Sequence, residues 1–222
     1  VMSGMLESSP IKYPELSYRI QATYKKGGNA RTPNYWLYNT GIQELNYSAS
    51  AGLRKEKYNT EIFVSSFNTD LGIFIGSHVG NLSDLQNAIT ASKPTQNIDA
   101  FSYAIGRPKQ NVQHYTVKSK SQFYLPNNNK VNLLVSYQKN LRKEFDRAML
   151  SNRPELDLDI STTMADVNFE SGPTKKISSN IGLVAMLQEN VWAGSRFFVP
   201  NFSKQNISFY IINNYNLNNL MF

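Results

Sequence analysis

A two-residue alternation of apolar and polar side chains is the feature that most constrains this fold, because it returns along nearly the whole chain. In residues 17–24, Tyr18, Ile20, Ala22 and Tyr24 occupy every second position, with polar side chains between them. Successive side chains of a β-strand point to opposite faces, so this spacing predicts a strand with one apolar and one polar face. The same spacing returns in seven further segments: 44–54, 58–69, 114–125, 131–138, 156–170, 177–189 and 205–212.

Strand length narrows the class of β-protein. The pattern predicts about nine strands, the last of which is cut short at the C-terminus. In the segment 156–170 the apolar residues change from one set of alternate positions to the other near Thr162. Many of these segments reach the 9–11 residues that a tilted strand needs to cross a bilayer. Strands of soluble proteins average only five or six residues. The lengths therefore favour a membrane protein.

The connections between these strands alternate between short and long. Short turns are expected at 54–57, 126–130, 171–176 and about 213–219, and long connections at about 25–43, 72–112, 140–156 and 190–204. In an up-and-down barrel every second connection lies on the same side of the membrane, which separates turns from loops. We therefore predict an all-β fold, an antiparallel up-and-down transmembrane β-barrel, with 1–222 as a single barrel segment.

Charged side chains recur on the polar face of the predicted strands. They are Arg19, Glu44, Glu61, Lys118 and Lys120. A soluble antiparallel sheet protein also alternates polar and apolar residues, but these charges would be costly in a dry core. They suit the wet interior of a barrel.

Composition excludes several other functions. The chain has no cysteine, and its only histidines are His78 and His114, so neither a thiolate metal site nor a catalytic centre is predicted. The net charge is +7, but Lys and Arg are scattered, so nucleic-acid binding is not expected. We predict no enzyme activity, no catalytic residue, no metal and no cofactor. No signal peptide is visible at the N-terminus, and both ends look like cuts through a longer protein.

The connection 72–112 is long enough to have a function of its own. Ser83 and Gln86 fit a capping box, and Leu82, Leu85, Ala88 and Ile89 recur at helical spacing. We therefore expect a short helix here. The connection either contacts a ligand or packs on the barrel wall.

Four stretches are distinctive in sequence beyond the alternation of apolar and polar residues. They are 27–41, 71–85, Arg107-Pro108 ahead of Gln113-His114, and 142–146. In this order they resemble the barrel of TonB-dependent outer-membrane receptors of the Bacteroidetes type. The resemblance covers nearly the whole chain, although no single stretch is as specific as a metal-ligand signature.

The resemblance implies a 22-stranded barrel with a plugged lumen, of which this chain supplies about nine strands. The plug, the energy-coupling box and the remaining strands would lie outside the sequence. It also implies the bacterial outer membrane as location, outer-membrane lipid and an energy-transducing inner-membrane complex as partners, and active uptake of a scarce ligand. Iron-siderophore complexes, haem, cobalamin and glycans are ligands of such receptors.

Aromatic and arginine side chains dominate recognition surfaces, so the expected ligand contacts lie in two long connections. They are Arg31, Tyr35 and Trp36 in one connection, and His78 and Asn81 in the other. The same residues could instead brace the loops against one another.

Two other functions remain open: a soluble or surface-exposed β-sheet binding module such as a lectin or adhesin, and a passive porin. A binding module predicts that the apolar residues face a second sheet, and a barrel predicts that they form one outward band. The residues that decide between them are Leu45, Tyr47, Ala49, Leu53, Val131, Leu133 and Val135.

Overall fold

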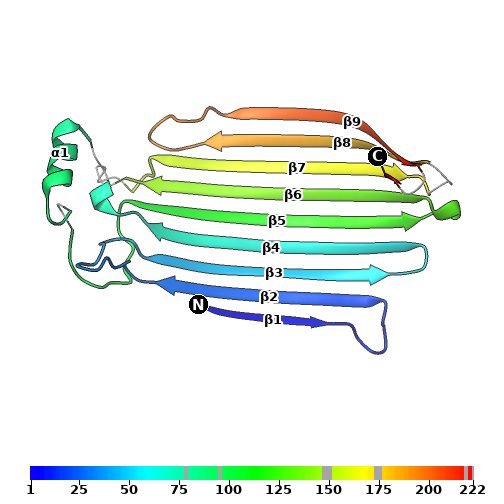
Figure 1. The fold of residues 1–222 in the computed structure, drawn as a ribbon, viewed down its shortest axis with the longest axis horizontal. Coiled ribbons are helices and arrows are strands. Elements are labelled where there is room, and N and C mark those ends of the chain that lie inside the picture. The colour runs from blue at the N-terminus through cyan, green and yellow to red at the C-terminus, as the bar shows by residue number, and fades with distance from the viewer. Residues whose placement is uncertain (78–79, 95–96, 147–151, 173–176, 218–219, 222) are drawn as a thin grey trace.

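The computed structural model folds the chain into one antiparallel sheet (Figure 1). It describes residues 1–77, 80–94, 97–146, 152–172, 177–217 and 220–221. The strands are β1 (Met2–Ser8), β2 (Leu16–Gly27), β3 (Ile42–Arg54), β4 (Tyr58–Gly72), β5 (Lys109–Tyr124), β6 (Lys130–Phe145), β7 (Leu156–Glu170), β8 (Ile177–Trp192), β9 (Phe202–Leu217) and the two-residue β10 (Leu220–Met221). The helices are the 3-10 turns η1 (Ile75–Ser77) and η2 (Pro126–Asn128) and the α-helix α1 (Leu82–Thr90).

Each strand pairs with the next one in sequence, so the order across the sheet is β1 to β10 without a crossover. The long connections lie at one end of the sheet, with α1 among them, and the short turns lie at the other end (Figure 1). The all-β, antiparallel, up-and-down prediction is confirmed. Within the described residues the sheet is open and does not close on itself.

Most of the strands are longer than the alternation predicts. β5 begins at Lys109 and β6 continues to Phe145. Beyond their apolar residues these two strands carry polar side chains, but the backbone pairing between them continues. β1 was not among the predicted strands, since Met5 and Leu6 stand side by side and break the alternation. The long connections are correspondingly shorter than predicted.

The two faces of the sheet differ in chemistry as predicted. The five charged residues Arg19, Glu44, Glu61, Lys118 and Lys120 all belong to one face, which we call the polar face. The seven residues named above as decisive share the other face, which we call the apolar face. No second sheet covers the apolar face in the described part of the chain, and Leu45, Tyr47 and Val135 are exposed there.

The parity change in β7 has a simple structural reason. The pairing of β6 with β7 runs from Lys130↔Glu170 to Glu144↔Leu156 without interruption, so no bulge turns the strand over. Instead, the residues of β7 on the apolar face are apolar near the turn end, at Ala165, Val167 and Phe169, and charged near the loop end, at Asp157 and Asp159. The parity change therefore marks the edge of the apolar surface.

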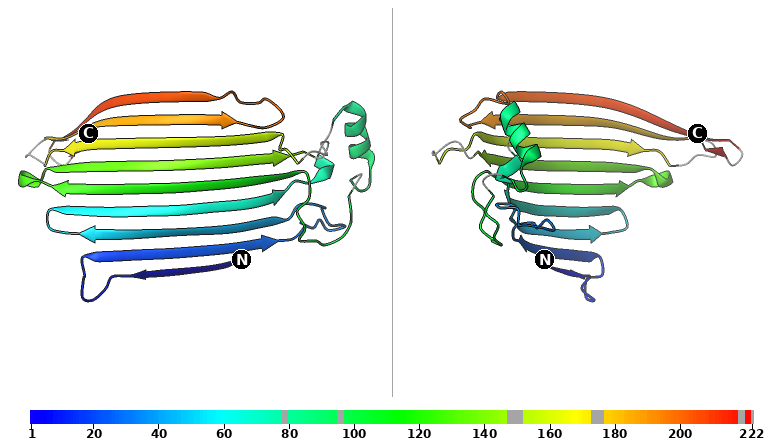
Figure 2. Two further views of the ribbon diagram at one scale, coloured as in Figure 1. Left: turned by 180° about the vertical axis from the view of Figure 1, so that it is seen from behind. Right: turned by 60° about the vertical axis from the view of Figure 1, so that its left-hand side comes forward.

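The helix α1 forms within the predicted connection, but its N-cap is Asn81 rather than Ser83. The Asn81 side chain accepts a hydrogen bond from the backbone N–H of Asp84 at 2.9 Å. The capping box of Ser83 and Gln86 was therefore wrong, because both residues lie inside the helix. Figure 2 shows α1 beyond the loop end of the sheet, and none of its residues is buried.

No helix in the described ranges is long and apolar enough to cross a membrane.

Candidate functional site

The apolar face carries a continuous band of exposed hydrophobic side chains across β2 to β9. It contains no Lys, Arg, Asp or Glu between its two edges. One exposed member from each strand illustrates its extent: Ile20, Leu45, Ile62, Val117, Leu133, Val167, Leu183 and Phe209. An uncovered apolar surface of this size marks an interaction with a partner or a membrane.

Aromatic side chains stand at both margins of this apolar band. Tyr24, Tyr47, Tyr115 and Tyr137 follow its loop-side margin, and Tyr58, Phe123, Phe169 and Tyr215 follow its turn-side margin. Aromatic rings at both edges of an apolar band are typical of strands that cross a bilayer, because such rings prefer the membrane–water interface.

The loop-side edge of the band runs diagonally across the strands. The first polar residue on the apolar face is Lys26 in β2, Lys139 in β6 and Gln205 in β9. Following the paired residues from strand to strand places Gln205 of β9 level with Ile20 of β2. Ile20 lies six residues closer to the turn end than Lys26 in the same strand. The edge thus moves by nearly one residue per strand.

When tilted strands cross a flat apolar layer such as a bilayer, the edge of their apolar band runs diagonally across the strands. A shift of nearly one residue per strand corresponds to a tilt of about 30° for strands about 4.8 Å apart. From Tyr115 to Phe123 in β5 the band spans about 26 Å along the strand, or about 23 Å across the slab after this tilt. Membrane barrels carry an apolar band about 25 Å tall on strands tilted by about 35–45°.

Ion pairs begin where the band ends. On the apolar face, Lys139 Nζ lies 2.9 Å from Asp159 Oδ2, and Lys143 Nζ lies 3.8 Å from Asp157 Oδ2. Both aspartates are partly exposed, whereas Glu155 in the same acidic run is only 4% exposed.

The polar face is a network of hydrogen-bonded side chains. Gln122 donates to Asn132 at 2.8 Å, and Asn132 donates to Asn168 and Glu170 at 2.8 and 3.1 Å. Farther along the sheet, His114 Nδ1 lies 3.3 Å from Asn140 Nδ2. These groups would be expensive to bury without water or a polar partner, so this face requires a wet or polar environment.

At the loop end, Asn39 joins the first three of the four stretches that carry the family resemblance. Its side-chain amide donates to the carbonyls of Ile73 and Pro108 at 2.9 and 2.7 Å, and its carbonyl accepts the N–H of Gly106 at 2.7 Å. Asn39 is 1% exposed and its φ is +60°. The fourth stretch is reached through Arg107, whose guanidinium lies 4.9 Å from the Phe145 ring centre. The loop end is thus one built unit.

Two of the predicted ligand-contact residues brace this loop end. Trp36 packs edge-to-face on Phe101, with ring centres 5.0 Å apart, and the Arg31 guanidinium lies 5.2 Å from the Trp36 ring. The backbone N–H of Trp36 donates to Asp99 Oδ1 at 2.8 Å. Tyr35 belongs to the same tight turn, in which its backbone carbonyl accepts the Thr32 N–H. Arg31 and Trp36 thus contact other residues of the loops.

The other two candidates do not join this group. Asn81 caps α1, which is a structural role. His78 lies outside the described residues. Sequence reasoning gave no role to Asn39, Asn97 and Asp99, because their partners are backbone groups of distant loops: Asn97, for example, accepts the N–H of Tyr38 and donates to the carbonyl of Trp36.

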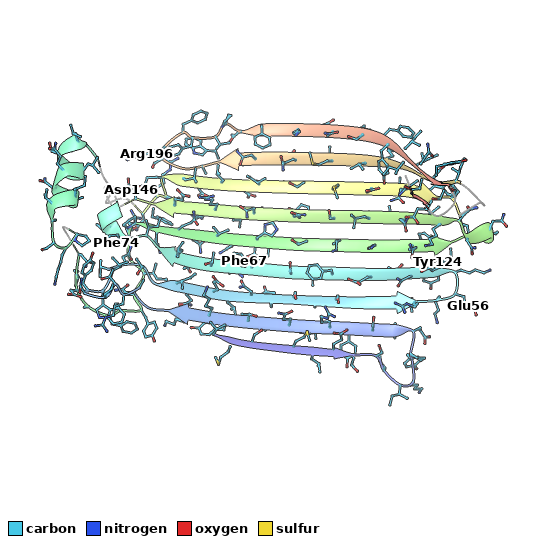
Figure 3. The ribbon with its side chains drawn as sticks, in the orientation of Figure 1. Glu56, Phe67, Phe74, Tyr124, Asp146 and Arg196 are labelled. Carbon is cyan, nitrogen blue, oxygen red and sulfur yellow. The ribbon has the colours of Figure 1, made fainter. Side chains whose placement is uncertain are left out.

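A second feature at the loop end is a pocket of about 210 Å³ between three connections, which we call the rim pocket. Phe74, Asp146 and Arg196 mark it in Figure 3, and the Arg196 guanidinium lies 3.7 Å from the Asp146 carboxylate. Glu155 also lines it; one carboxylate oxygen accepts the N–H of Asp146, and the other makes no hydrogen bond. No sequence signal could have assembled residues from three separate connections.

Acidification is expected to loosen the Trp36 loop. The hydrogen bond from the Trp36 N–H, together with Lys93 and the Arg31 charge, holds the pKa of Asp99 below its ordinary value of 3.8, although burial opposes this. A lowered pKa means that the stabilisation is complete above the ordinary value and is lost as pH falls through the folded-state value. Trp36 fluorescence, recorded in a Trp192→Phe background, should therefore change below about pH 4.

The matched variant for this experiment is Asp99→Asn, which keeps an oxygen that can accept the Trp36 N–H but cannot titrate. We expect its Trp36 emission to stay constant over the same pH range. An equal transition in both proteins would mean that another group controls the loop.

The described residues contain no group of three or more His, Asp or Glu side chains placed to hold a metal ion. No protein-family model matches the chain, and a search of curated proteins finds no match. The resemblance to TonB-dependent receptors therefore stays a prediction.

Proposed function

We propose that this chain forms part of the wall of a transmembrane β-barrel in the bacterial outer membrane. The observation that carries the proposal is the diagonal apolar band with aromatic side chains at both margins. A soluble sheet protein would have to cover this band with a second layer, and the described residues provide none. The polar face would then line the interior, where water or a polar partner meets its charges.

The barrel requires more strands than this sheet supplies. β1, of seven residues, lies at one edge of the open sheet, and β9, of sixteen residues, lies beside the short β10 at the other. Open edges are not tolerated in hydrocarbon. In the proposal, further strands pair with these edges and close the barrel.

Within this class we propose a TonB-dependent transport receptor that takes up a scarce ligand such as an iron-siderophore complex, haem or cobalamin. Its support is the resemblance of four stretches that meet at the loop end around Asn39 and Phe145. The loop end would face the outside of the cell and offer the first ligand contacts. Arg31, Tyr35, Trp36, His78 and Asn81 are the candidate residues in these loops.

Uptake measurements distinguish the proposed receptor from its rivals. The full-length protein should sediment with outer membranes, and ligand accumulation in intact cells should stop when a protonophore collapses the proton-motive force. A passive porin predicts accumulation that does not respond to the protonophore. A lectin-like binding module predicts protein that leaves the membrane in salt or carbonate washes.

A further inference from the structure

The rim pocket is lined by a buried carboxylate of which one oxygen has no partner. Glu155 is only 4% exposed; its Oε2 accepts the Asp146 N–H, and its Oε1 makes no hydrogen bond in the described part of the chain. No Lys or Arg of these residues forms an ion pair with Glu155. A buried charge without a partner is costly, so this oxygen calls for a cationic donor from outside the described chain.

The backbone holds Glu155 in this position. Its N–H donates to the Glu144 carbonyl at 2.9 Å, and its carbonyl accepts the Arg196 N–H at 3.0 Å. Gly194 packs so closely that a Cβ there would lie 2.3 Å from the Glu155 carbonyl oxygen. Moving Glu155 towards solvent would break these contacts, so the carboxylate stays buried.

A cation without a carboxylate partner lines the same pocket. Lys109 pairs with Phe145 in the ladder of β5 and β6, and its Nζ lies 5.3 Å from the centre of the Phe145 ring. Lys109 forms no ion pair in the described ranges. Glu155 flanks Phe145 on the side of β7, through its hydrogen bonds to Glu144 and Asp146. The two unpaired charges therefore come from strands on either side of β6, about 10 Å apart at the backbone.

The other charged residues of the lining already have partners. The Asp146 carboxylate pairs with Arg196, and the Glu144 carboxylate pairs with Arg142 and accepts a hydrogen bond from Gln110. One negative and one positive group thus remain for a ligand.

The rest of the lining is apolar. It consists of Ile73, Phe74, Pro108, Phe145, Leu156 and Phe198. The pocket volume of about 210 Å³ is below the range of about 300–1,000 Å³ that is typical of pockets for drug-sized ligands. The ligand is therefore small and carries an apolar group beside its charges.

We propose that the rim pocket binds one free α-amino acid with an apolar side chain. Its ammonium group donates to Glu155 Oε1, its carboxylate pairs with Lys109, and its side chain contacts Phe74 and Phe198. An amine without a carboxylate leaves Lys109 unpaired, and a carboxylate without an ammonium group leaves Glu155 unpaired, so a zwitterion fits best. The inference does not depend on the membrane location.

The test uses the full-length protein in mild detergent and equilibrium dialysis with radiolabelled L-leucine. Wild-type protein should retain one leucine per chain. Two unlabelled competitors share the apolar stem of leucine and each lack one charge: 3-methylbutylamine lacks the carboxylate, and 4-methylpentanoate lacks the ammonium group. Each should compete at least about tenfold more weakly than leucine, because it leaves one charge of the site without its partner.

Two variants assign the two charges to their side chains. Glu155→Gln should weaken leucine binding by at least about tenfold without weakening the binding of 4-methylpentanoate. Lys109→Met removes the positive charge and should weaken leucine binding similarly without weakening that of 3-methylbutylamine. Lys109 is half-buried, so this variant decides the question even where Glu155→Gln does not fold. The matched control is Asp157→Asn, which belongs to the same acidic run but lies outside the pocket lining and pairs with Lys143; its leucine binding should be unchanged.

Three results would overturn the proposal. The first is that the wild type retains no leucine. The second is that 3-methylbutylamine competes as well as leucine, because the pocket would then be a site for amines. The third is an equal loss of leucine binding in Glu155→Gln and Asp157→Asn, because overall charge would then control retention.

Failure of the membrane proposal looks different. If the wild-type protein retains leucine but does not insert into phosphatidylethanolamine–phosphatidylglycerol vesicles, only the proposed function fails. If it inserts but retains no leucine, only the amino-acid site fails.

Discussion

In the proposed membrane barrel, Leu133→Arg is expected to destabilise the inserted protein by about 2–4 kcal/mol, the cost of an arginine at the midplane of a lipid-facing surface. Leu133 lies in the apolar band of β6, between Val131 and Val135 on the same face, and is 36% exposed. Its ladder neighbours are Ser121 of β5 and Val167 of β7, so no acidic side chain stands beside it to pair with the new charge. Urea titration of the refolded protein in lipid vesicles measures the effect.

The control is the next residue, which has the same side chain and the opposite orientation. Leu134 lies on the polar face, level with Lys120 of β5 and Asp166 of β7. Leu134→Arg places the charge where ions already occur, so we expect a change of less than about 1 kcal/mol. Equal destabilisation by the two variants would contradict the assignment of the faces.

Asn39→Ala is expected to open the loop end while leaving the sheet folded. The substitution removes three hydrogen bonds. The Pro108 carbonyl still accepts the Ile73 N–H, but the Ile73 carbonyl and the Gly106 N–H lose the partner that Asn39 gives them. Each unpaired buried group costs about 1–3 kcal/mol, and alanine at a φ of +60° adds about 1 kcal/mol. The local stability of the loops should fall by about 3–7 kcal/mol. Hydrogen exchange at the Gly72, Gly106 and Asn29 amides measures this loss.

Asn39→Gly separates the two contributions. Glycine accepts a φ of +60° but makes none of the three hydrogen bonds, so it should recover only about 1 kcal/mol of the loss. If the alanine and glycine variants both exchange like wild type, Asn39 does not hold the loops together. Slow exchange in β5 and β6 should persist in every variant, because their ladders do not depend on Asn39.

Much of the fold was predictable because strand periodicity is local. The segment 156–170 was predicted to the residue, and the order of short turns and long loops was correct. The parity change near Thr162 was also visible in the sequence. Its meaning was not, because only the register of β6 with β7 shows that the ladder continues without a bulge. The diagonal course of the band likewise requires the register of every strand pair.

The loop end could not be predicted in the same way. Asn39, Asn97 and Asp99 act through backbone groups about 34 to 69 residues away, and no periodicity encodes such contacts. The rim pocket is assembled from three connections and has no sequence signature. Helix α1 was found from its apolar spacing, but its cap was missed because Asn81 competes with Ser83 as an N-cap residue.

The most direct test of the proposal that the apolar band spans a membrane is a spin-label scan of β6 and β3 in lipid vesicles. The chain has no cysteine, so single cysteines can be introduced at consecutive positions without background labelling. Collision with oxygen, which concentrates in hydrocarbon, should be high at 131, 133, 135 and 137 and should end at Lys139. In β3 it should extend from Leu53 to Leu45, which lies level with Leu141 of β6. The predicted result is an oxygen accessibility that alternates every two residues and reaches farther toward the loops in β3 than in β6. Equal accessibility of both faces to a water-soluble nickel chelate would contradict a lipid-facing band.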